Sequence, residues 1–408
     1  MASTDEIEQT AQTGAHSVYG YIERTAEPQA DGVRWQTLNW DNEPHYDPSV
    51  FNGVAGVSLF LADYHRLTGS PRALDLAQGA LRWCSQPERL NAPAPDWRRD
   101  GLIRGRAGIA MAGLRLAAVA GDRQTLETAV TIAEQLLQKE PGPLTDWQDG
   151  AAGEGLFLLR LAKVSGDKRF LDGAVRSAAW LDSVAIKDER GCYWPWRTDD
   201  SPHAKWYGLS FIPGSAGIAH FLLSLYAATQ DSRWAALAKE AGETLERQAR
   251  PDRGGLNWPD TMDGLENGED LRCQWCYGAS GVGLYFAKAY EVLGPEAAPT
   301  ALATAEAAGE TTFQYGDVRR NPVQCHGLAG NAELFLALYS VTGQPRWRER
   351  AHDFALRALA YRRTTPEGDV WQADDPGYES PDFLYGAAGT GHFFLRLWRP
   401  NEITRPLL

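Results

Sequence analysis

The chain has 408 residues, of which 43% are hydrophobic and 23% charged, a composition typical of a globular protein with a large core. Its formal net charge of −13 argues against nucleic acid and anionic membrane surfaces as partners. There is no run of about 18 apolar residues and no signal segment, and the five cysteines form no disulfide-like framework, so we expect no membrane span and a cytoplasmic location.

A seven-fold repeat organises the sequence. Each copy carries Gly-x-x-Gly followed by an apolar run at helical spacing, which predicts a helix buried on most sides. Most of these helices are expected to end in a short turn containing Gly, Asp, Ser or Pro, as at 68–72. The first glycines of the seven motifs are Gly53, Gly105, Gly150, Gly214, Gly278, Gly327 and Gly386.

A more charged, amphipathic helix is predicted after each of these turns. Clear examples cover 72–83, 125–139 and 233–248, and one further amphipathic helix over 5–22 precedes the first repeat. Apolar helices that alternate with amphipathic ones predict an all-α fold, an (α/α)7 toroid of seven inner and seven outer helices. We expect it to form a single domain over residues 1–408.

The connections from outer to inner helices are long and rich in Trp and Pro. If the ring closes, these loops lie on the face that carries the Gly-x-x-Gly motifs, where repeat scaffolds usually bind their ligands. The tryptophans in these loops either line a peptide groove or plug the ring and order the loops. They include Trp194, Trp196, Trp206, Trp258 and Trp371.

Three potential metal ligands stand just before the first glycine of two consecutive repeats. Cys276 lies two residues before Gly278, and Cys325 and His326 directly precede Gly327. Equivalent offsets in adjacent repeats place side chains at the same height on one rim, so we expect the three to converge. Two sulfurs and one imidazole suit Zn²⁺ with a fourth position left open, the pattern of a catalytic site. The alternative is a buried pair of free cysteines beside a hydrogen-bonded histidine.

We call the few residues just before the first glycine of each motif the slot. The slot carries different residues in the two repeats before Cys276. In repeat three it reads Asp-Trp-Gln-Asp, with Asp146 and Asp149. Asp149 is expected to cap the next helix by accepting backbone N–H groups, whereas Asp146 could reach into the mouth of the ring. In repeat four the slot ends in Pro213 and has no titratable group, and Cys273 in repeat five lies off the slot.

At these residues the chain resembles the lanthionine synthetase C-like family, over essentially its whole length. The motifs Trp-Cys-Tyr-Gly and Cys-His-Gly, in this order on a seven-fold Gly-x-x-Gly background, are very specific to that family. The resemblance implies an α,α-toroid with a zinc ion held by Cys276, Cys325 and His326. It also implies catalytic roles for the residues that match the family's active-site positions: Asp146, Arg272 and Tyr277.

One position departs from the family pattern. The family usually has a His immediately before the repeat-four Gly-x-x-Gly, where it is implicated in proton transfer, and this chain has Pro213 there. Pro cannot move protons. His203, His220 and His392 are candidates to replace the missing group, although a lone His in an apolar helix is more often a packed core residue.

The resemblance implies a zinc-dependent cyclase that adds Cys thiols of a ribosomal peptide to dehydroalanine or dehydrobutyrine and so forms thioether rings. Its partner would be a dehydrated precursor peptide, prepared by a separate kinase, lyase or dehydratase. The alternative, favoured by Pro213, is a non-cyclising, zinc-containing protein that binds a peptide or acts as a scaffold. A carbohydrate-active (α/α) barrel would need a facing pair of carboxylates and no Cys/Cys/His set.

Overall fold

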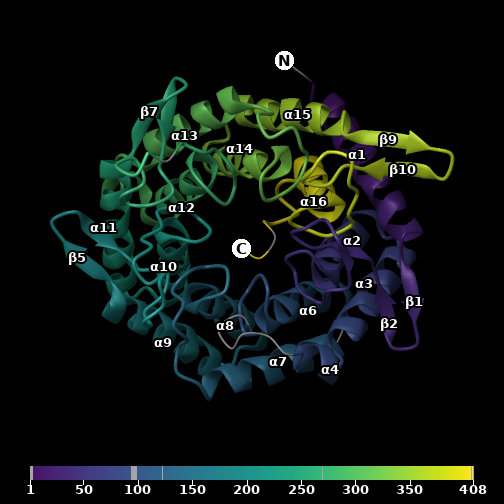
Figure 1. Cartoon of the computed structure of the whole chain (residues 1–408), viewed down its shortest axis with the longest axis horizontal. Coiled ribbons are helices and arrows are strands. Elements are labelled where there is room, and N and C mark those ends of the chain that lie inside the picture. The colour runs from purple at the N-terminus through teal and green to yellow at the C-terminus, as the bar shows by residue number, and fades with distance from the viewer. Residues whose placement is uncertain (1–2, 93–98, 122, 269, 406, 408) are drawn as a thin grey trace.

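The helices form two concentric rings (Figure 1) in a computed structural model that describes residues 3–92, 99–121, 123–268, 270–405 and 407. The inner ring consists of α2 (Val54–Thr68), α6 (Arg106–Ala120), α8 (Ala151–Ser165), α10 (Ser215–Thr229), α12 (Ala279–Ala297), α14 (Leu328–Thr342) and α16 (Ala387–Trp398). The outer ring consists of α1 (Thr4–Arg24), α3 (Pro71–Cys84), α7 (Arg123–Leu137), α9 (Lys168–Val184), α11 (Ser232–Gln248), α13 (Ala301–Tyr315) and α15 (Pro345–Leu359). The expected (α/α)7 toroid is confirmed, and a short helix, α4 (Pro87–Leu90), follows α3.

Each inner helix begins directly after the first glycine of its motif, and the second glycine lies in its first turn. A Cβ atom on Gly281 would overlap the carbonyl oxygen of Trp275, and one on Gly330 would overlap that of Gln324. The second glycine therefore lets the loop before the helix fold back against the helix itself. This close approach fixes the height of the loop residues on the rim.

The predicted turns between inner and outer helices are also confirmed. Gly69, Gly121, Gly166 and Gly343 each end an inner helix in the left-handed conformation, and Gln230 takes the same role after α10. Glycine adopts this conformation without the steric cost that a Cβ atom adds.

The long loops contain short strands that the all-α prediction did not include. Each strand has only two to four residues, too few for an alternating pattern to be recognised in the sequence. The strands pair into antiparallel two-stranded sheets. The pairs are β1 (Glu27–Gln29) with β2 (Gly32–Arg34), β3 (Thr37–Leu38) with β4 (Pro44–His45), β5 (Ile186–Asp188) with β6 (Gly191–Tyr193), β7 (Arg250–Asp252) with β8 (Gly255–Asn257), and β9 (Arg362–Thr365) with β10 (Gly368–Trp371).

Buried tryptophans anchor these hairpins to the outer helices. The indole N–H of Trp194 donates to the carbonyl of Leu181 at 2.7 Å, and that of Trp258 donates to Leu245 at 2.7 Å. Trp371 is equally buried at the end of β10. A role in a peptide groove is therefore wrong for these three tryptophans, which order the loops as the alternative interpretation stated.

No helix in the part of the chain that the structure describes combines the length and the apolar character that crossing a membrane requires.

Candidate metal centre

The residues two positions before the first glycines hydrogen-bond to one another around the rim. These backbone N–H···O=C bonds join neighbouring repeats at N···O distances of 2.9–3.1 Å. Corresponding residues of adjacent repeats thus lie at one height, as the repeat predicted. The bonds run from Phe51 to Ile103, from Ile103 to Gln148, from Ile212 to Cys276, from Cys325 to Leu384 and from Leu384 to Phe51.

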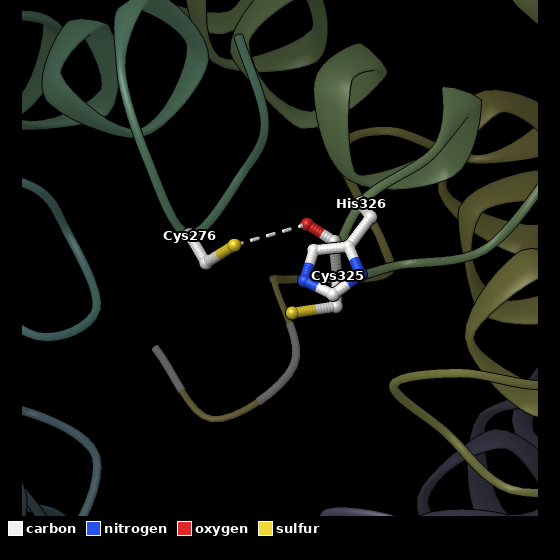
Figure 2. A group of neighbouring side chains, drawn as sticks. All are labelled: Cys276, Cys325 and His326. Carbon is white, nitrogen blue, oxygen red and sulfur yellow. Dashed lines mark hydrogen bonds between the residues drawn. The ribbon is translucent and has the colours of Figure 1, made fainter. Parts of the chain in front are cut away.

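Cys276, Cys325 and His326 meet on this rim (Figure 2). One potential ligand atom from each lies within 4.8 Å of the corresponding atoms of the other two. The sulfur of Cys276 lies 3.5 Å from the carbonyl oxygen of Cys325, so the two repeats meet through the sulfur at this position. The expected convergence of the three side chains is confirmed.

The electrostatics of the cluster favour charge separation. Burial raises the pKa of the Cys276 thiol, but its hydrogen bond with Cys325 and the nearby charge of His326 outweigh burial and lower the pKa to about 5. The same hydrogen bond, together with burial, raises the pKa of Cys325. Burial lowers the pKa of His326, yet the Cys276 thiolate and Asp374 raise it to about 9. These shifts favour a negative charge on Cys276 beside a protonated His326, and a divalent cation would take the place of the remaining protons.

Asp374 orients the histidine of the cluster. The Nδ1 atom of His326 lies 3.0 and 3.2 Å from the two carboxylate oxygens of Asp374, and Asn321 donates to the same carboxylate at 2.9 Å. A carboxylate on Nδ1 leaves Nε2 as the ligand atom, an arrangement common at histidine metal sites. The sequence analysis missed Asp374 because it lies in the loop before repeat seven, away from the slot that supplies the ligands.

A cavity of about 430 Å³ opens beside the cluster, and we call it the site cavity. Its wall includes Arg272 and Tyr277, as well as Cys276, Cys325 and His326. The guanidinium of Arg272 forms an ion pair with Asp260 and lies 4.0 Å from the centre of the Tyr277 ring. Burial raises the pKa of Tyr277 to about 12, so its hydroxyl stays protonated at neutral pH. Arg272 and Tyr277 are thus brought to the cluster.

The sequence of the chain matches a known protein family. A family model described as "Lanthionine synthetase C-like protein" matches residues 44–408. The chain belongs to the lanthionine synthetase C-like family. Over 141 residues it is 33% identical to Glutathione S-transferase LANCL1 of Danio rerio, an alignment that spans 34% of this chain but only 31% of that relative.

Solved structures confirm the fold of this family member. Nisin cyclase superposes with a TM-score of 0.65 at 15% identity, covering 96% of this chain and 95% of that chain. A family 76 α-mannanase from Bacteroides thetaiotaomicron superposes with a TM-score of 0.53 at 12% identity, covering 96% of each chain. At such low identities the likeness concerns the toroid alone, and a shared fold does not imply a shared function.

Asp146 does not lie on the wall of the site cavity in this family member. Its carboxylate is buried and accepts hydrogen bonds from the backbone N–H groups of Gln148 and Asp149 at 2.6 and 2.9 Å. Its other oxygen accepts the indole N–H of Trp196 at 2.6 Å. Burial raises the pKa of Asp146, although these hydrogen bonds act in the opposite direction. Trp196 lines the cavity, so Asp146 is connected to the site indirectly, by holding the indole of Trp196 in position.

The expected helix cap at Asp149 is wrong. Its carboxylate lies 2.8 Å from the side-chain nitrogen of Gln148 and 3.5 Å from Arg104. The helix begins at Ala151, and Gly150, at the N-cap position before it, has no side chain to cap it. Asp146, and not Asp149, accepts backbone N–H groups here, and they belong to Gln148 and Asp149 in the tight turn before the helix.

Of the three histidines considered as proton donors, His203 alone lines the site cavity, as Pro213 also does. His220 is 3% exposed and packs against Phe211, with 5.4 Å between the ring centres. His392 is fully buried and lies 2.9 Å from a carboxylate oxygen of Asp63. The latter two are core residues, as a lone histidine on an apolar helix usually is.

Proposed function

We propose that this chain is a zinc-dependent peptide cyclase that adds Cys thiols to dehydroalanine or dehydrobutyrine and so forms thioether rings of the lanthionine type. The observation that carries the proposal is the meeting of Cys276, Cys325 and His326 at the wall of a cavity, in a chain of the lanthionine synthetase C-like family. The substrate would be a dehydrated ribosomal peptide supplied by a separate kinase, lyase or dehydratase.

The donor set fits Zn²⁺. Two sulfurs and one imidazole within 4.8 Å of one another match the protein ligands of a catalytic zinc site, with a further position left for substrate. When bound, Zn²⁺ would lower the pKa of a substrate thiol, which is about 8.5 in a free cysteine, and so supply the thiolate. All five cysteines are free, which is compatible with the reducing cytoplasm we propose as the location.

Arg272 and Tyr277 provide the electrostatic part of the reaction. As the substrate sulfur bonds to the β-carbon of the dehydro residue, the electrons of the C=C bond move toward the carbonyl oxygen and form an enolate. The guanidinium of Arg272, held by Asp260 and by the ring of Tyr277, can stabilise the charge on this oxygen. The protonated hydroxyl of Tyr277 is a second donor at the same wall.

Asp146 takes a positioning role in this proposal. Its carboxylate fixes the indole of Trp196, which together with Trp206 forms an aromatic part of the cavity wall. A rigid wall of this kind holds the substrate in a conformation from which the thiol can attack.

The peptide has room on both sides of the cluster. A second cavity of about 510 Å³ shares Arg272 and His326 with the site cavity. A substrate peptide that passes over Arg272 and His326 would place one residue at the cluster. The neighbouring residues of the peptide would then occupy the second cavity.

A non-cyclising zinc protein that binds a peptide or serves as a scaffold is the second candidate. The observation that favours it is Pro213, which occupies the cavity wall without any titratable group. Because a relative carries the name Glutathione S-transferase LANCL1, addition of a soluble thiol to the same dehydro residue is a further outcome to be measured.

The deciding assay incubates the protein with a dehydrated precursor peptide and follows peptide mass and the number of thiols that iodoacetamide can alkylate. A cyclase removes alkylatable thiols without changing the peptide mass. Loss of thiols at the rate seen without protein would contradict cyclisation and leave the binding role. In a parallel sample with glutathione, a mass gain of one glutathione would indicate the intermolecular reaction.

Asp374 supplies a prediction about metal affinity. Asp374→Asn removes the charge that holds His326 while keeping the shape of the side chain, and it should weaken zinc binding about 10–100-fold. The measurement is competition with a chromophoric chelator. Asp375→Asn is the matched control, because Asp375 is exposed and bonds Asn42 at 2.9 Å. Equal affinity in the two variants would show that Asp374 does not support the ligand.

A further inference from the structure

The cyclisation leaves one chemical requirement unassigned. Addition of the thiol produces an enolate, and the product forms only when the α-carbon receives a proton. The inference below rests on the proposed function. A suitable donor has to face the site cavity, belong to a side chain that can give up a proton and be able to recover that proton from solvent.

The described residues on the cavity wall leave few candidates for this donor. His326 belongs to the cysteine cluster, and its Nδ1 atom is held by Asp374. Burial raises the pKa of Tyr277 to about 12 and also raises that of Tyr385, so both are weak acids. Arginine side chains stay protonated throughout catalysis, which excludes Arg104 and Arg272. Asp260 is paired with Arg272.

His203 meets the three requirements. It lies on the wall of the site cavity, in the loop between β6 and α10 that also delivers Pro213 to that wall. Its side chain is exposed, so solvent can return a proton to the ring after each turnover. Imidazole is the side chain that most often transfers protons in general acid–base catalysis.

The loop holds the imidazole in a defined place. The ring of His203 packs edge-on against Trp196, with 5.9 Å between ring centres, and its backbone carbonyl accepts the N–H of Trp206 at 3.1 Å. The hydroxyl of Ser201 accepts the backbone N–H of His203 at 3.3 Å. Because Asp146 bonds the indole of Trp196 at 2.6 Å, this buried carboxylate also fixes the surface on which His203 packs.

We propose that His203 is the catalytic acid that protonates the α-carbon of the enolate. The electron pair of the enolate forms the new C–H bond, the N–H bond of the imidazolium breaks, and its electron pair remains on nitrogen. The imidazole then takes up a proton from solvent, which balances the proton released by the substrate thiol. No oxidant, reductant or further reactant is consumed.

The test compares His203→Ala and His203→Gln with the parent protein in the cyclisation assay. We expect the rate to fall on the order of 10²-fold, the lower range for loss of an acid catalyst. We also expect the α-carbon configuration of the ring to change from one isomer to a mixture, because solvent protonates both faces of an enolate. Imidazole added to the buffer should restore part of the rate to His203→Ala.

Lys205→Ala is the matched control, because Lys205 is exposed on the same loop and does not line the cavity. Its rate and product configuration should equal those of the parent. Zinc content should be the same in all variants, which separates proton donation from damage to the metal site. An active parent with a His203→Ala variant of unchanged rate and single configuration would overturn this inference alone. A parent that does not cyclise would overturn the proposed function as well.

Discussion

Replacing Cys325 by Ala should remove zinc and cyclisation activity together. Cys325 is 6% exposed and supplies one of the two sulfurs of the cluster, so its loss leaves only Cys276 and His326 as protein ligands. Two ligands do not form the three-residue set of a catalytic zinc site. We expect zinc to fall from about one per chain to near zero, measured by elemental analysis after dialysis.

Cys273→Ala provides a control for the general loss of a buried thiol, in the loop that carries Cys276. Cys273 is also buried, and its sulfur lies 3.6 Å from the Thr312 hydroxyl, away from the cluster. Burial raises its pKa to about 12, which opposes the thiolate form that a metal requires. This variant should keep its zinc. Full zinc in Cys325→Ala, or equal loss in both variants, would refute the proposed ligand set.

Replacing Arg272 by Ala should lower kcat about 10²–10³-fold while zinc content stays unchanged. The guanidinium acts on charge that develops during addition, so the loss should appear in kcat more than in KM. The side chain faces the site cavity and pairs with Asp260, which is only 6% exposed. Truncation therefore also leaves a buried carboxylate beside the forming enolate.

A second variant separates these two effects. In Arg272→Ala/Asp260→Asn the unpaired carboxylate is neutralised, so any recovery of rate measures its repulsion and the remaining deficit measures the lost guanidinium. Arg272→Lys keeps the charge but loses the planar fork of donors, and it should retain an intermediate rate. If kcat of Arg272→Ala stays within a few-fold of the parent, Arg272 does not stabilise the enolate.

The repeat explains how much of the ring could be predicted from sequence. Gly-x-x-Gly marks the start of every inner helix, so counting motifs gave the number of helices and the height of each slot. The rim hydrogen bond from Ile212 to Cys276 joins slots of adjacent repeats in the way this counting requires. The convergence of the ligands followed from the same argument.

The details of the loops could not be obtained in this way. Hairpin strands of three residues, such as β5, are too short to give an alternating pattern. Asp374 lies in the loop before repeat seven, twelve residues before Gly386, and only the folded path of that loop brings it to His326. Asp149 is nearer to the helix than Asp146, so the sequence suggested Asp149 as the cap. In the structure, the turn directs the backbone N–H groups of Gln148 and Asp149 to the carboxylate of Asp146.

Zinc K-edge X-ray absorption of the purified protein, with and without a Cys-containing substrate peptide, tests the central claim most directly. We expect zinc with two sulfur neighbours, from Cys276 and Cys325, and a nitrogen neighbour from His326. Addition of the peptide should raise the number of sulfur neighbours to three. Zinc without sulfur neighbours, or a sulfur count that the peptide leaves unchanged, would contradict a site built to activate a substrate thiol.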